Sequence, residues 1–327
     1  MLAAVAFAQS AEDPLSGLVL KDVPAPEPRG GWSVVRVSHS SVNMHDLWTL
    51  RGVGHPAERL PMILGCDAAG WDEQGNRVLV YPIIADPDAG DGDETLDPGR
   101  ALLSEQHDGA FAEYLSVPTR NLIPIPDWLS FEQAACLPVA WGTAFRMLFT
   151  QARIRPGDRV LVQGVRGGVA SAAITLAAAA GAHVYATTRD LQMGQIAKAW
   201  GAREVLESGA RLPERVDVII ETVGEATWSH SLKSLRPGGT VVVSGATSGM
   251  HPSADLGRIF YLQQRVLGST GCTRPELQQL LRVMEATGAR PHVDRRFRLQ
   301  DIHQAIQVMM DGAQIGKLVI DIADEGE

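Results

Sequence analysis

A short segment, VNMHDLWTLRG at residues 42–52, places three chemically capable side chains between apolar neighbours. Asn43 can donate an amide N–H to a carbonyl or enolate oxygen, His45 can relay a proton near neutral pH, and Asp46 can orient either of them. Two structural alternatives stand beside these roles, because Asp46 can cap a helix that begins near DLWTL and His45 can form a structural hydrogen bond. Asn43, His45 and Asp46 are the candidate catalytic residues.

Three further side chains are candidates for a substrate pocket: Trp48, Cys66 and Trp141. A tryptophan can line an aromatic acceptor pocket, although core packing is the usual role of a large aromatic side chain. A cysteine is more often a small buried apolar group than a reactive thiol. A metal held by His45, Cys66 and Asp67 remains open at this point, because the ligand types fit and the geometry is unknown.

The most informative segment is DRVLVQGVRGGVASAAITLAAAAGAHVYATTRD at residues 158–190. A predicted strand over residues 160–163 runs into a glycine-rich turn, an alanine-rich helix and a second strand that ends at Thr187. Small residues at the turn let backbone amides approach a pyrophosphate, and the helix N-terminus offers unpaired N–H groups to the anion. The order predicts a dinucleotide-binding unit, with a purely structural turn as the alternative. The predicted contacts in the turn are Gly164, Arg166, Gly167, Gly168 and Val169.

The end of the second predicted strand selects the cofactor. An NAD site normally places an acidic residue there to bond the ribose 2′-hydroxyl, whereas this chain has Thr187, Thr188 and Arg189. Hydroxyl groups and a guanidinium suit a 2′-phosphate. We therefore predict NADPH as the cofactor, with Asp190 as the competing acidic residue that would favour NADH.

Composition limits the partners that the protein can have. A chain of 327 residues, 45% hydrophobic and 20% charged, suits about two globular domains. Its formal charge of −9 argues against nucleic acid or an anionic membrane, which leaves small molecules. The three scattered cysteines fit a reducing compartment, and the opening MLAAVAFAQS lacks the basic start of a signal peptide. We expect a cytoplasmic protein whose first strand lies in this opening segment.

The predicted elements indicate an α/β protein with two kinds of domain. The first third holds short β-branched runs between turn residues, which is typical of an antiparallel, barrel-like domain. From about residue 122, helices alternate with short apolar strands, which indicates a doubly wound parallel sheet. One of these helices is predicted over residues 131–149. The tail from residue 291 returns to strand, helix and strand, and it can close onto the first domain. The segment at 86–99 is expected to be a solvated acidic loop, because its register does not fit a calcium loop.

The chain as a whole resembles the medium-chain dehydrogenase/reductase superfamily, specifically its zinc-free quinone oxidoreductase branch. The resembling segments occur in family order: SSVNMHDLWTLRG, LPMILGCDAAG, HDGAFAEYLSVP, LPVAWGTAF, VLVQGVRGGVAS, ETVG, LRPGGTVVVSGATSG and QIGKLVIDI. The resemblance implies a GroES-like catalytic domain at residues 1–121 and 288–327, and a Rossmann NADP(H)-binding domain at residues 122–287. It also implies a homodimer joined through the Rossmann domains.

The resemblance also bears on single residues. The zinc branch carries metal ligands where this chain has Asn43, Cys66 and Val139, so no metal is expected. Gly54 lies near the place of a cleft tyrosine in quinone oxidoreductases. Lys317 matches a lysine at the family's cleft, and its structural alternative is a charge at a strand edge. The cofactor contacts implied by the resemblance are Thr143, Val223, Gly224, Ser244, Gly245, Thr270 and Lys317.

Without a Lewis acid, hydride has to reach an acceptor that is already electrophilic. The leading hypothesis is therefore an NADPH-dependent oxidoreductase that reduces a quinone or an α,β-unsaturated carbonyl compound. The alternatives are a free-standing enoyl reductase that acts on acyl thioesters, a zinc-type alcohol dehydrogenase, and a non-catalytic NADPH-binding sensor.

Overall fold

The computed structural model describes residues 1–323, which form two compact units. Among the described residues, the first unit contains residues 1–139, 273–278 and 293–323, and the second contains residues 140–272 and 279–292. The domain boundaries expected after residues 121 and 287 stay a prediction. Within residues 1–323, no helix is both long enough and apolar enough to span a bilayer.

The first unit is built on β-sheets, as expected for the N-terminal third. Its largest sheet has seven strands in the order β10-β6-β5-β3-β18-β17, with β9 also paired to β3, and the smaller sheets have the orders β2-β1-β4 and β7-β8. Most of these pairs are antiparallel. The strands are β1 (Leu2–Ala6), β2 (Leu18–Asp22), β3 (Trp32–Ser41), β4 (Met62–Ile63), β5 (Ala69–Trp71), β6 (Arg77–Val80), β7 (Ile83–Ile84), β8 (Ala101–Leu102), β9 (Tyr114–Pro118), β10 (Leu122–Pro124), β17 (Val293–Arg298) and β18 (Lys317–Asp321).

The C-terminal tail closes onto this unit, as predicted. Strand β18 lies between β3, to which it is antiparallel, and β17, to which it is parallel. The helix α9 (Ile302–Met310) connects the two C-terminal strands and buries residues spaced three and four apart, namely Ile302, Ala305, Ile306 and Met309. They share a core with α1 (Met44–Leu50), which begins directly after β3. Asn43 lies between β3, which pairs with β18, and α1, which packs against α9, so both neighbouring elements hold its backbone in place.

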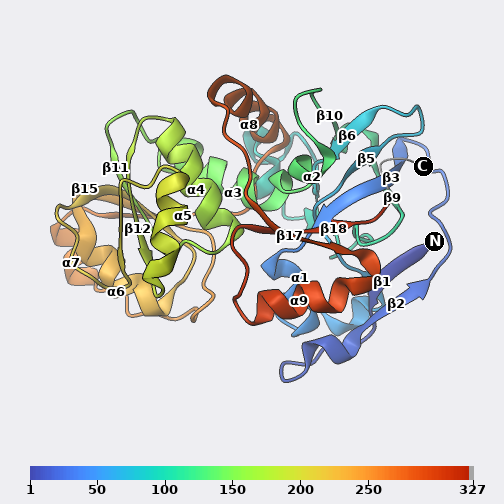
Figure 1. Ribbon diagram of the computed structural model, residues 1–327, viewed down its shortest axis with the longest axis horizontal. Coiled ribbons are helices and arrows are strands. Elements are labelled where there is room, and N and C mark those ends of the chain that lie inside the picture. Colours follow the sequence, from blue (N-terminus) through green and yellow to red (C-terminus); the bar gives the residue numbers. More distant parts are fainter. Residues whose placement is uncertain (324–327) are drawn as a thin grey trace. The chain divides into compact units, whose positions relative to one another are not determined.

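The second unit is a doubly wound sheet. Its six strands are all parallel and follow the order β13-β12-β11-β14-β15-β16, so the order in the sheet reverses between β11 and β14. Three of these strands, β11, β12 and β15, are labelled in Figure 1. Ligands of such folds bind at this reversal, outside the carboxyl ends of the strands. The strands are β11 (Arg159–Val162), β12 (His183–Thr188), β13 (Glu204–Glu207), β14 (Val216–Glu221), β15 (Leu235–Val243) and β16 (Arg265–Gly268). The predicted α/β class with a Rossmann sheet is confirmed.

The remaining elements are helical. The other α-helices are α2 (Phe131–Ala134), α3 (Gly142–Phe145), α4 (Gly168–Ala179), α5 (Gly194–Ala199), α6 (Glu225–Ser234), α7 (Leu256–Tyr261) and α8 (Arg274–Thr287). The short 3₁₀ turns are η1 (Pro14–Gly17), η2 (Ala57–Arg59), η3 (Ala89–Gly92), η4 (Glu94–Leu96), η5 (Thr119–Asn121), η8 (Leu191–Met193) and η9 (Leu299–Asp301).

One local prediction was wrong, and another holds for only part of its segment. The single helix expected over residues 131–149 is divided, because π-helical turns at Leu137–Trp141 and Arg146–Gln151 interrupt it. Pro138 lies in the first of these turns, and its missing N–H removes a helical hydrogen bond. The acidic segment is not solvated throughout, because Glu94 is buried and accepts hydrogen bonds from Arg120 Nη2 at 2.7 Å and from the backbone N–H of Arg274 at 2.8 Å.

Candidate active site

The side chain of Asn43 is buried, and its hydrogen-bonding groups are all used within the first unit. Its Nδ2 donates to Asp67 Oδ2 at 2.8 Å and to the carbonyl oxygen of Ser41 at 3.2 Å. Its Oδ1 accepts a hydrogen bond from Lys317 Nζ at 2.8 Å. Both amide hydrogens therefore already have acceptors, and donation to a substrate oxygen would require one of these bonds to break.

Lys317 forms the centre of this cluster. Its ammonium donates three hydrogen bonds, to Val42 O at 3.0 Å, Asn43 Oδ1 at 2.8 Å and Asp67 Oδ2 at 3.3 Å. The side chains of Lys317 and Asp67 are only 3% and 0% exposed, so they form a buried ion pair. Because β18 is paired on both sides, the alternative of a strand-edge charge for Lys317 is wrong. These bonds use all three N–H donors of the ammonium group, so the predicted contact of Lys317 with the cofactor would require one of them to break.

The positions that carry zinc ligands in the zinc branch do not fit a metal here. Asn43 binds an ammonium group, and Val139 offers only a backbone N–H, which donates to Asp67 Oδ1 at 2.9 Å. The Cys66 thiol donates to the carbonyl oxygen of Leu103 at 3.3 Å, and burial raises its pKa well above the ordinary value, so it stays protonated. Among residues 1–323, no group of three or more His, Cys, Asp or Glu side chains is arranged to hold a metal ion.

Asp46 is the third residue of α1 and is fully buried. Its Oδ2 accepts the backbone N–H of Asn43 at 2.8 Å, and its Oδ1 accepts the backbone N–H of Gly65 at 3.0 Å. Burial raises its pKa to about 7, against the opposing effect of these two bonds. Asp46 thus holds the start of the helix against the turn before Cys66, which is the capping alternative of the sequence analysis. Its direct catalytic role stays a prediction.

His45 is only partly exposed and has an unpaired ring nitrogen. Its Nε2 lies 3.9 Å from Glu105 Oε1 and has no hydrogen-bond partner among the described residues. Burial, together with the neighbouring His55, lowers its pKa to about 4. The imidazole is therefore neutral at pH 7, and it is a poor proton donor near neutrality. This pKa disagrees with the near-neutral titration that the proposed relay assumed.

His55 was missed by the sequence analysis. It follows Gly54 in the loop after α1, it is 5% exposed, and both of its ring nitrogens lack a hydrogen-bond partner among the described residues. Its backbone carbonyl accepts a hydrogen bond from Gln9 Nε2 at 2.9 Å. Burial and the charge of Arg59 lower its pKa, so it too is neutral at pH 7. No pattern in RGVGHPAER marks this histidine as buried.

The three predicted pocket residues lie in different surroundings. Trp48 is half-buried on α1, Cys66 is fully buried in the first unit, and Trp141 is buried at the start of the second unit. The Cys66 thiol has the properties of a small core side chain and not those of a reactive group. A role for the two tryptophans in the substrate pocket stays a prediction.

The glycine-rich turn of the second unit has the form that a dinucleotide site needs. Gly164 directly follows β11 with a φ of +83°, which favours glycine, and Gly167 caps the helix that begins at Gly168 and Val169. A Cβ atom at Gly167 would meet nothing within 4 Å, so the space in front of the helix N-terminus is open. The first amides of α4, including those of Gly168 and Val169, have no intrahelical partner and can bind a pyrophosphate. The residues present fit the cofactor.

The side chains at the end of β12 and just after it lie in different surroundings. Thr188 is buried. Its hydroxyl donates to the carbonyl oxygen of Asp190 at 3.1 Å and accepts the backbone N–H of Asp190, also at 3.1 Å. The carboxylate of Asp190 caps the turn that follows and accepts a hydrogen bond from Arg166 Nη2 at 2.8 Å. Arg189 is exposed, and the described residues offer its side chain no hydrogen bond or ion pair. Arg166 therefore pairs with the carboxylate of Asp190, whereas the guanidinium of Arg189 has no partner among the described residues.

The loop after β14 is held by a buried carboxylate that the sequence analysis missed. Glu221 Oε1 accepts the backbone N–H groups of Val223 at 2.9 Å and Gly224 at 3.1 Å. Glu221 Oε2 accepts the Ser231 hydroxyl at 2.6 Å, and that hydroxyl accepts Gln163 Nε2 at 2.9 Å. Gln163 immediately precedes Gly164, so one hydrogen-bonded network supports both loops at the carboxyl edge of the sheet.

The other predicted cofactor contacts also lie in the second unit. Ser244 and Gly245 directly follow β15, and the backbone N–H of Ser244 donates to the carbonyl oxygen of Glu221 at 3.0 Å. Thr270 is exposed beyond β16, whereas Thr143 is buried in α3. Their contacts with a cofactor stay predictions.

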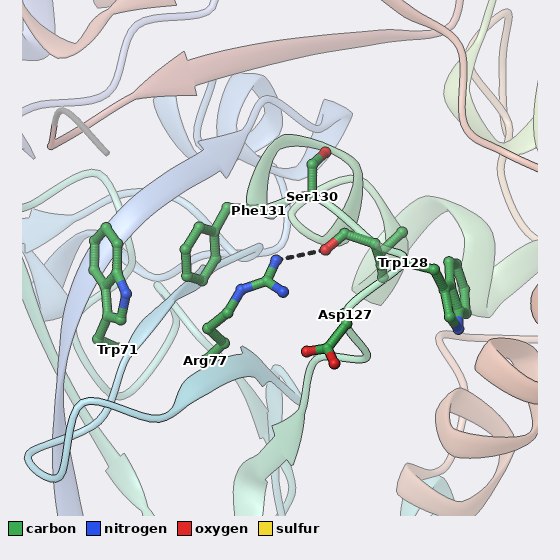
Figure 2. Close-up of a pocket in the computed structure, with 7 residues that line it drawn as sticks. Trp71, Arg77, Asp127, Trp128, Ser130 and Phe131 are labelled. Carbon is green, nitrogen blue, oxygen red and sulfur yellow. Dashed lines mark hydrogen bonds between the residues drawn. The ribbon is translucent and has the colours of Figure 1, made fainter. Parts of the chain in front are cut away.

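A separate cavity of about 490 Å³ lies in the first unit (Figure 2). Arg77 places its guanidinium carbon 4.7 Å from the ring centre of Phe131, and the rings of Trp71 and Phe131 form an edge-type contact with their centres 4.6 Å apart. The cavity is lined by Trp71, Arg77, Asp127, Trp128, Leu129, Ser130 and Phe131. None of the predicted site residues lines it, so we do not assign the chemistry to it.

Comparison with known proteins agrees with a β-rich first unit followed by a dinucleotide-binding second unit. Residues 29–127 match the family model of the alcohol dehydrogenase GroES-like domain, and residues 168–286 match that of the zinc-binding dehydrogenase. The chain is 28% identical to acryloyl-coenzyme A reductase of Sulfurisphaera tokodaii, covering 94% of this chain and 97% of that protein. It is also 28% identical to quinone oxidoreductase of Mus musculus, covering 91% and 92%.

Solved structures are similar over nearly the whole chain. A crystal structure of an NAD-dependent alcohol dehydrogenase has a TM-score of 0.91 at 29% identity, covering 99% of this chain and 100% of that one. The 2-octenoyl-CoA carboxylase reductase CinF, in complex with NADP and 2-octenoyl-CoA, has a TM-score of 0.89 at 25% identity, covering 99% and 89%. The chain is an oxidoreductase and belongs to the medium-chain dehydrogenase/reductase superfamily.

Proposed function

We propose that this protein is an NADPH-dependent reductase of acceptors in which a carbonyl group is conjugated to a double bond, and that it works without a metal. The observation that carries the proposal is the cluster of Lys317, Asn43 and Asp67. Where the zinc branch holds a dication, these buried side chains hold an ammonium group. An acceptor for this enzyme must therefore be electrophilic by its own conjugation.

NADPH, when bound, supplies the hydride. The glycine-rich turn and the N-terminus of α4 offer amides for its pyrophosphate, and the network from Gln163 to Glu221 holds the two loops in shape. The task of the first unit is to hold the acceptor and to stabilise the negative charge that develops on its oxygen. The proton that completes the reduction comes from water.

The preference for NADPH rests on side chains beyond β12. Arg189 is exposed and unpaired among the described residues, so it is available for a 2′-phosphate. Asp190 is the group that would bind the ribose hydroxyls of NADH, and its carboxylate is already bonded to Arg166 and to the following turn. The similar structures include one named with NADP and one named NAD-dependent, so the argument depends on these residues.

Two classes of acceptor follow from the relatives. The acryloyl-coenzyme A reductase and the octenoyl-CoA enzyme act on thioesters whose carbonyl is conjugated to a double bond, as their names state, and the mouse relative is a quinone oxidoreductase. Enoyl thioesters are at least as well supported as quinones and simple enones. These two classes and simple enones share a carbonyl oxygen conjugated to a double bond, which the proposal requires.

The test is NADPH or NADH oxidation, followed at the nicotinamide absorbance, with crotonyl-CoA, methyl vinyl ketone, benzoquinone and acetaldehyde, each with and without a chelator. We expect turnover of at least one conjugated acceptor, faster with NADPH and unaffected by the chelator. Chelator-sensitive reduction of acetaldehyde would contradict the proposal. NADPH binding without any turnover would instead support a sensor.

We also propose that the protein is a homodimer joined through the second unit. Among the described residues, strand β16 is an edge strand that pairs with β15 alone, and the adjacent helix α7 exposes large apolar side chains. The exposed fractions are 69% for Leu256, 74% for Phe260, 80% for Tyr261 and 44% for Val266. A second copy of the same edge would pair with β16 and cover these groups.

A further inference from the structure

Two neighbouring histidines in the first unit carry buried ring nitrogens that nothing among the described residues satisfies. They are His45 Nε2 and both ring nitrogens of His55. A buried polar atom without a partner destabilises the folded protein, so unpaired groups of this kind require an explanation. The nearest charged partner of His45 is Glu105, whose Oε1 lies 3.9 Å from Nε2, beyond hydrogen-bonding distance.

The same unit lacks another free donor among its candidate catalytic groups. The Asn43 amide donates to Asp67 and to Ser41 O, and the three hydrogens of the Lys317 ammonium are used. Asp46 accepts two backbone N–H groups. A reductase of conjugated carbonyls needs a donor for the developing oxyanion, and these residues do not supply one.

We propose that His55 donates a ring N–H to the carbonyl oxygen of the acceptor, with His45 beside it as the second imidazole of the same site. This inference rests on the proposed function and adds a catalytic residue to it. The acceptor oxygen would satisfy a nitrogen that is otherwise buried without a partner.

A neutral imidazole suits this task. It carries one N–H donor, and it can donate to an oxyanion without transferring its proton. Burial lowers the pKa of both histidines, and the charge of Arg59 lowers that of His55 further, whereas Glu105 raises it. In the overall reduction the acceptor gains a hydride from NADPH and a proton from water, while His55 keeps its proton throughout. A metal at this pair is not proposed, because no described cluster has the required three ligands.

The experiment compares His55→Phe, His55→Gln and the control His107→Phe in the full-length protein. His107 is a half-buried histidine of the same unit whose ring contacts that of Trp32 at a tilted angle, with the ring centres 5.2 Å apart, and a phenyl ring preserves that contact. For each protein we would measure kcat and KM on the acceptor that wild type accepts, NADPH affinity, and thermal unfolding. We expect His55→Phe to lower kcat by about 100-fold, as loss of one oxyanion donor typically does, with NADPH affinity unchanged.

The stability readout separates catalysis from a structural role. Replacing an unsatisfied buried imidazole by an apolar ring should leave the unfolding temperature equal or higher, whereas a structural histidine would destabilise the protein when lost. We expect His55→Gln, which keeps an N–H donor, to recover part of kcat, and His107→Phe to match wild type. Full turnover in His55→Phe would overturn the inference, as would equal losses of turnover in His55→Phe and His107→Phe.

The design also distinguishes this inference from the proposed function. If wild type reduces no conjugated acceptor, the proposed function fails. Binding of cyclohexenone, measured by calorimetry, then decides the inference: weaker binding to His55→Phe than to wild type supports it, and equal binding overturns it.

Discussion

His45 is held neutral by its surroundings, and this has a measurable consequence for stability. Its pKa is lowered from 6.5 to about 4 in the folded protein, so the unfolded chain binds more protons between these two values. The contribution of the neutral His45 imidazole to the free energy of unfolding is therefore fully present above pH 6.5. It is lost as the pH falls towards 4, by up to about 3 kcal/mol.

The matching variant is His45→Gln, which has no titrating group at this position. We expect the free energy of unfolding of wild type to fall more steeply than that of the variant as the pH is lowered over this range. Because the raised pKa of Asp46 acts in the opposite direction, only the difference between the two proteins is informative. Urea unfolding at a series of pH values would measure it, and identical pH profiles would show that His45 titrates normally.

Lys317 and Asp67 give a second prediction at this scale. Removing one partner of a buried ion pair leaves the other charge uncompensated, so Lys317→Met should destabilise the protein by about 3–5 kcal/mol. The control is Arg258→Met, whose ion pair with Asp255 is partly exposed and should contribute less than about 1 kcal/mol.

Adding Asp67→Asn to Lys317→Met should restore part of the lost stability, because it removes the stranded carboxylate. Chemical denaturation of the three variants would measure these effects. Equal, small effects of Lys317→Met and Arg258→Met would contradict the buried charge pair.

Residue types were easier to predict than residue partners. Asn43, Asp46 and Lys317 were recognised as site candidates, but the bond from Lys317 to Asn43 joins residues 274 positions apart. Sequence spacing carries no information about such a contact. The same holds for His55, whose burial depends on how its loop packs.

At the scale of elements, two glycines of the glycine-rich turn allow a controlled comparison of alanine substitutions. Gly164 has a φ of +83°, where an alanine is strained, whereas Gly167 has an ordinary φ of −72°. We expect Gly164→Ala to lower stability by about 1–3 kcal/mol. Gly167→Ala should leave the stability of the unliganded protein nearly unchanged and weaken NADPH binding, because its methyl group enters the open space before α4.

Thermal unfolding without cofactor and NADPH titration would check both variants. Unchanged NADPH affinity in Gly167→Ala would contradict the placement of the pyrophosphate at this turn.

Elements whose apolar residues recur at a regular spacing were predicted well, whereas a helix interrupted by π-helical turns was not. The strand, turn and helix around Gly164 and the returning C-terminal strand followed from apolar patterning. The segment at 131–149 has the composition of one helix, yet it contains Pro138 and is interrupted by π-helical turns. A π-turn has no distinct composition, so patterning cannot locate it.

At the scale of the whole molecule, the exposed edge strand β16 of the second unit leads to a prediction of the oligomeric state. Wild type should be a dimer, and Val266→Lys on β16 should shift it to monomer, because a charge on an edge strand opposes pairing with a second copy. Val19→Lys is the control, since Val19 is similarly exposed on β2, an edge strand of the first unit.

Light scattering after size-exclusion chromatography would distinguish the two variants. A monomeric wild type, or equal behaviour of Val266→Lys and Val19→Lys, would contradict the interface.

The most direct test of metal-independent conjugate reduction is the fate of deuterium from NADPH labelled at its hydride position, with methyl vinyl ketone as acceptor, measured with and without a chelator. We expect deuterium at the β-carbon of a saturated ketone, formed at a rate that the chelator does not change. Deuterium at the carbonyl carbon of an alcohol, formed only without the chelator, would contradict it.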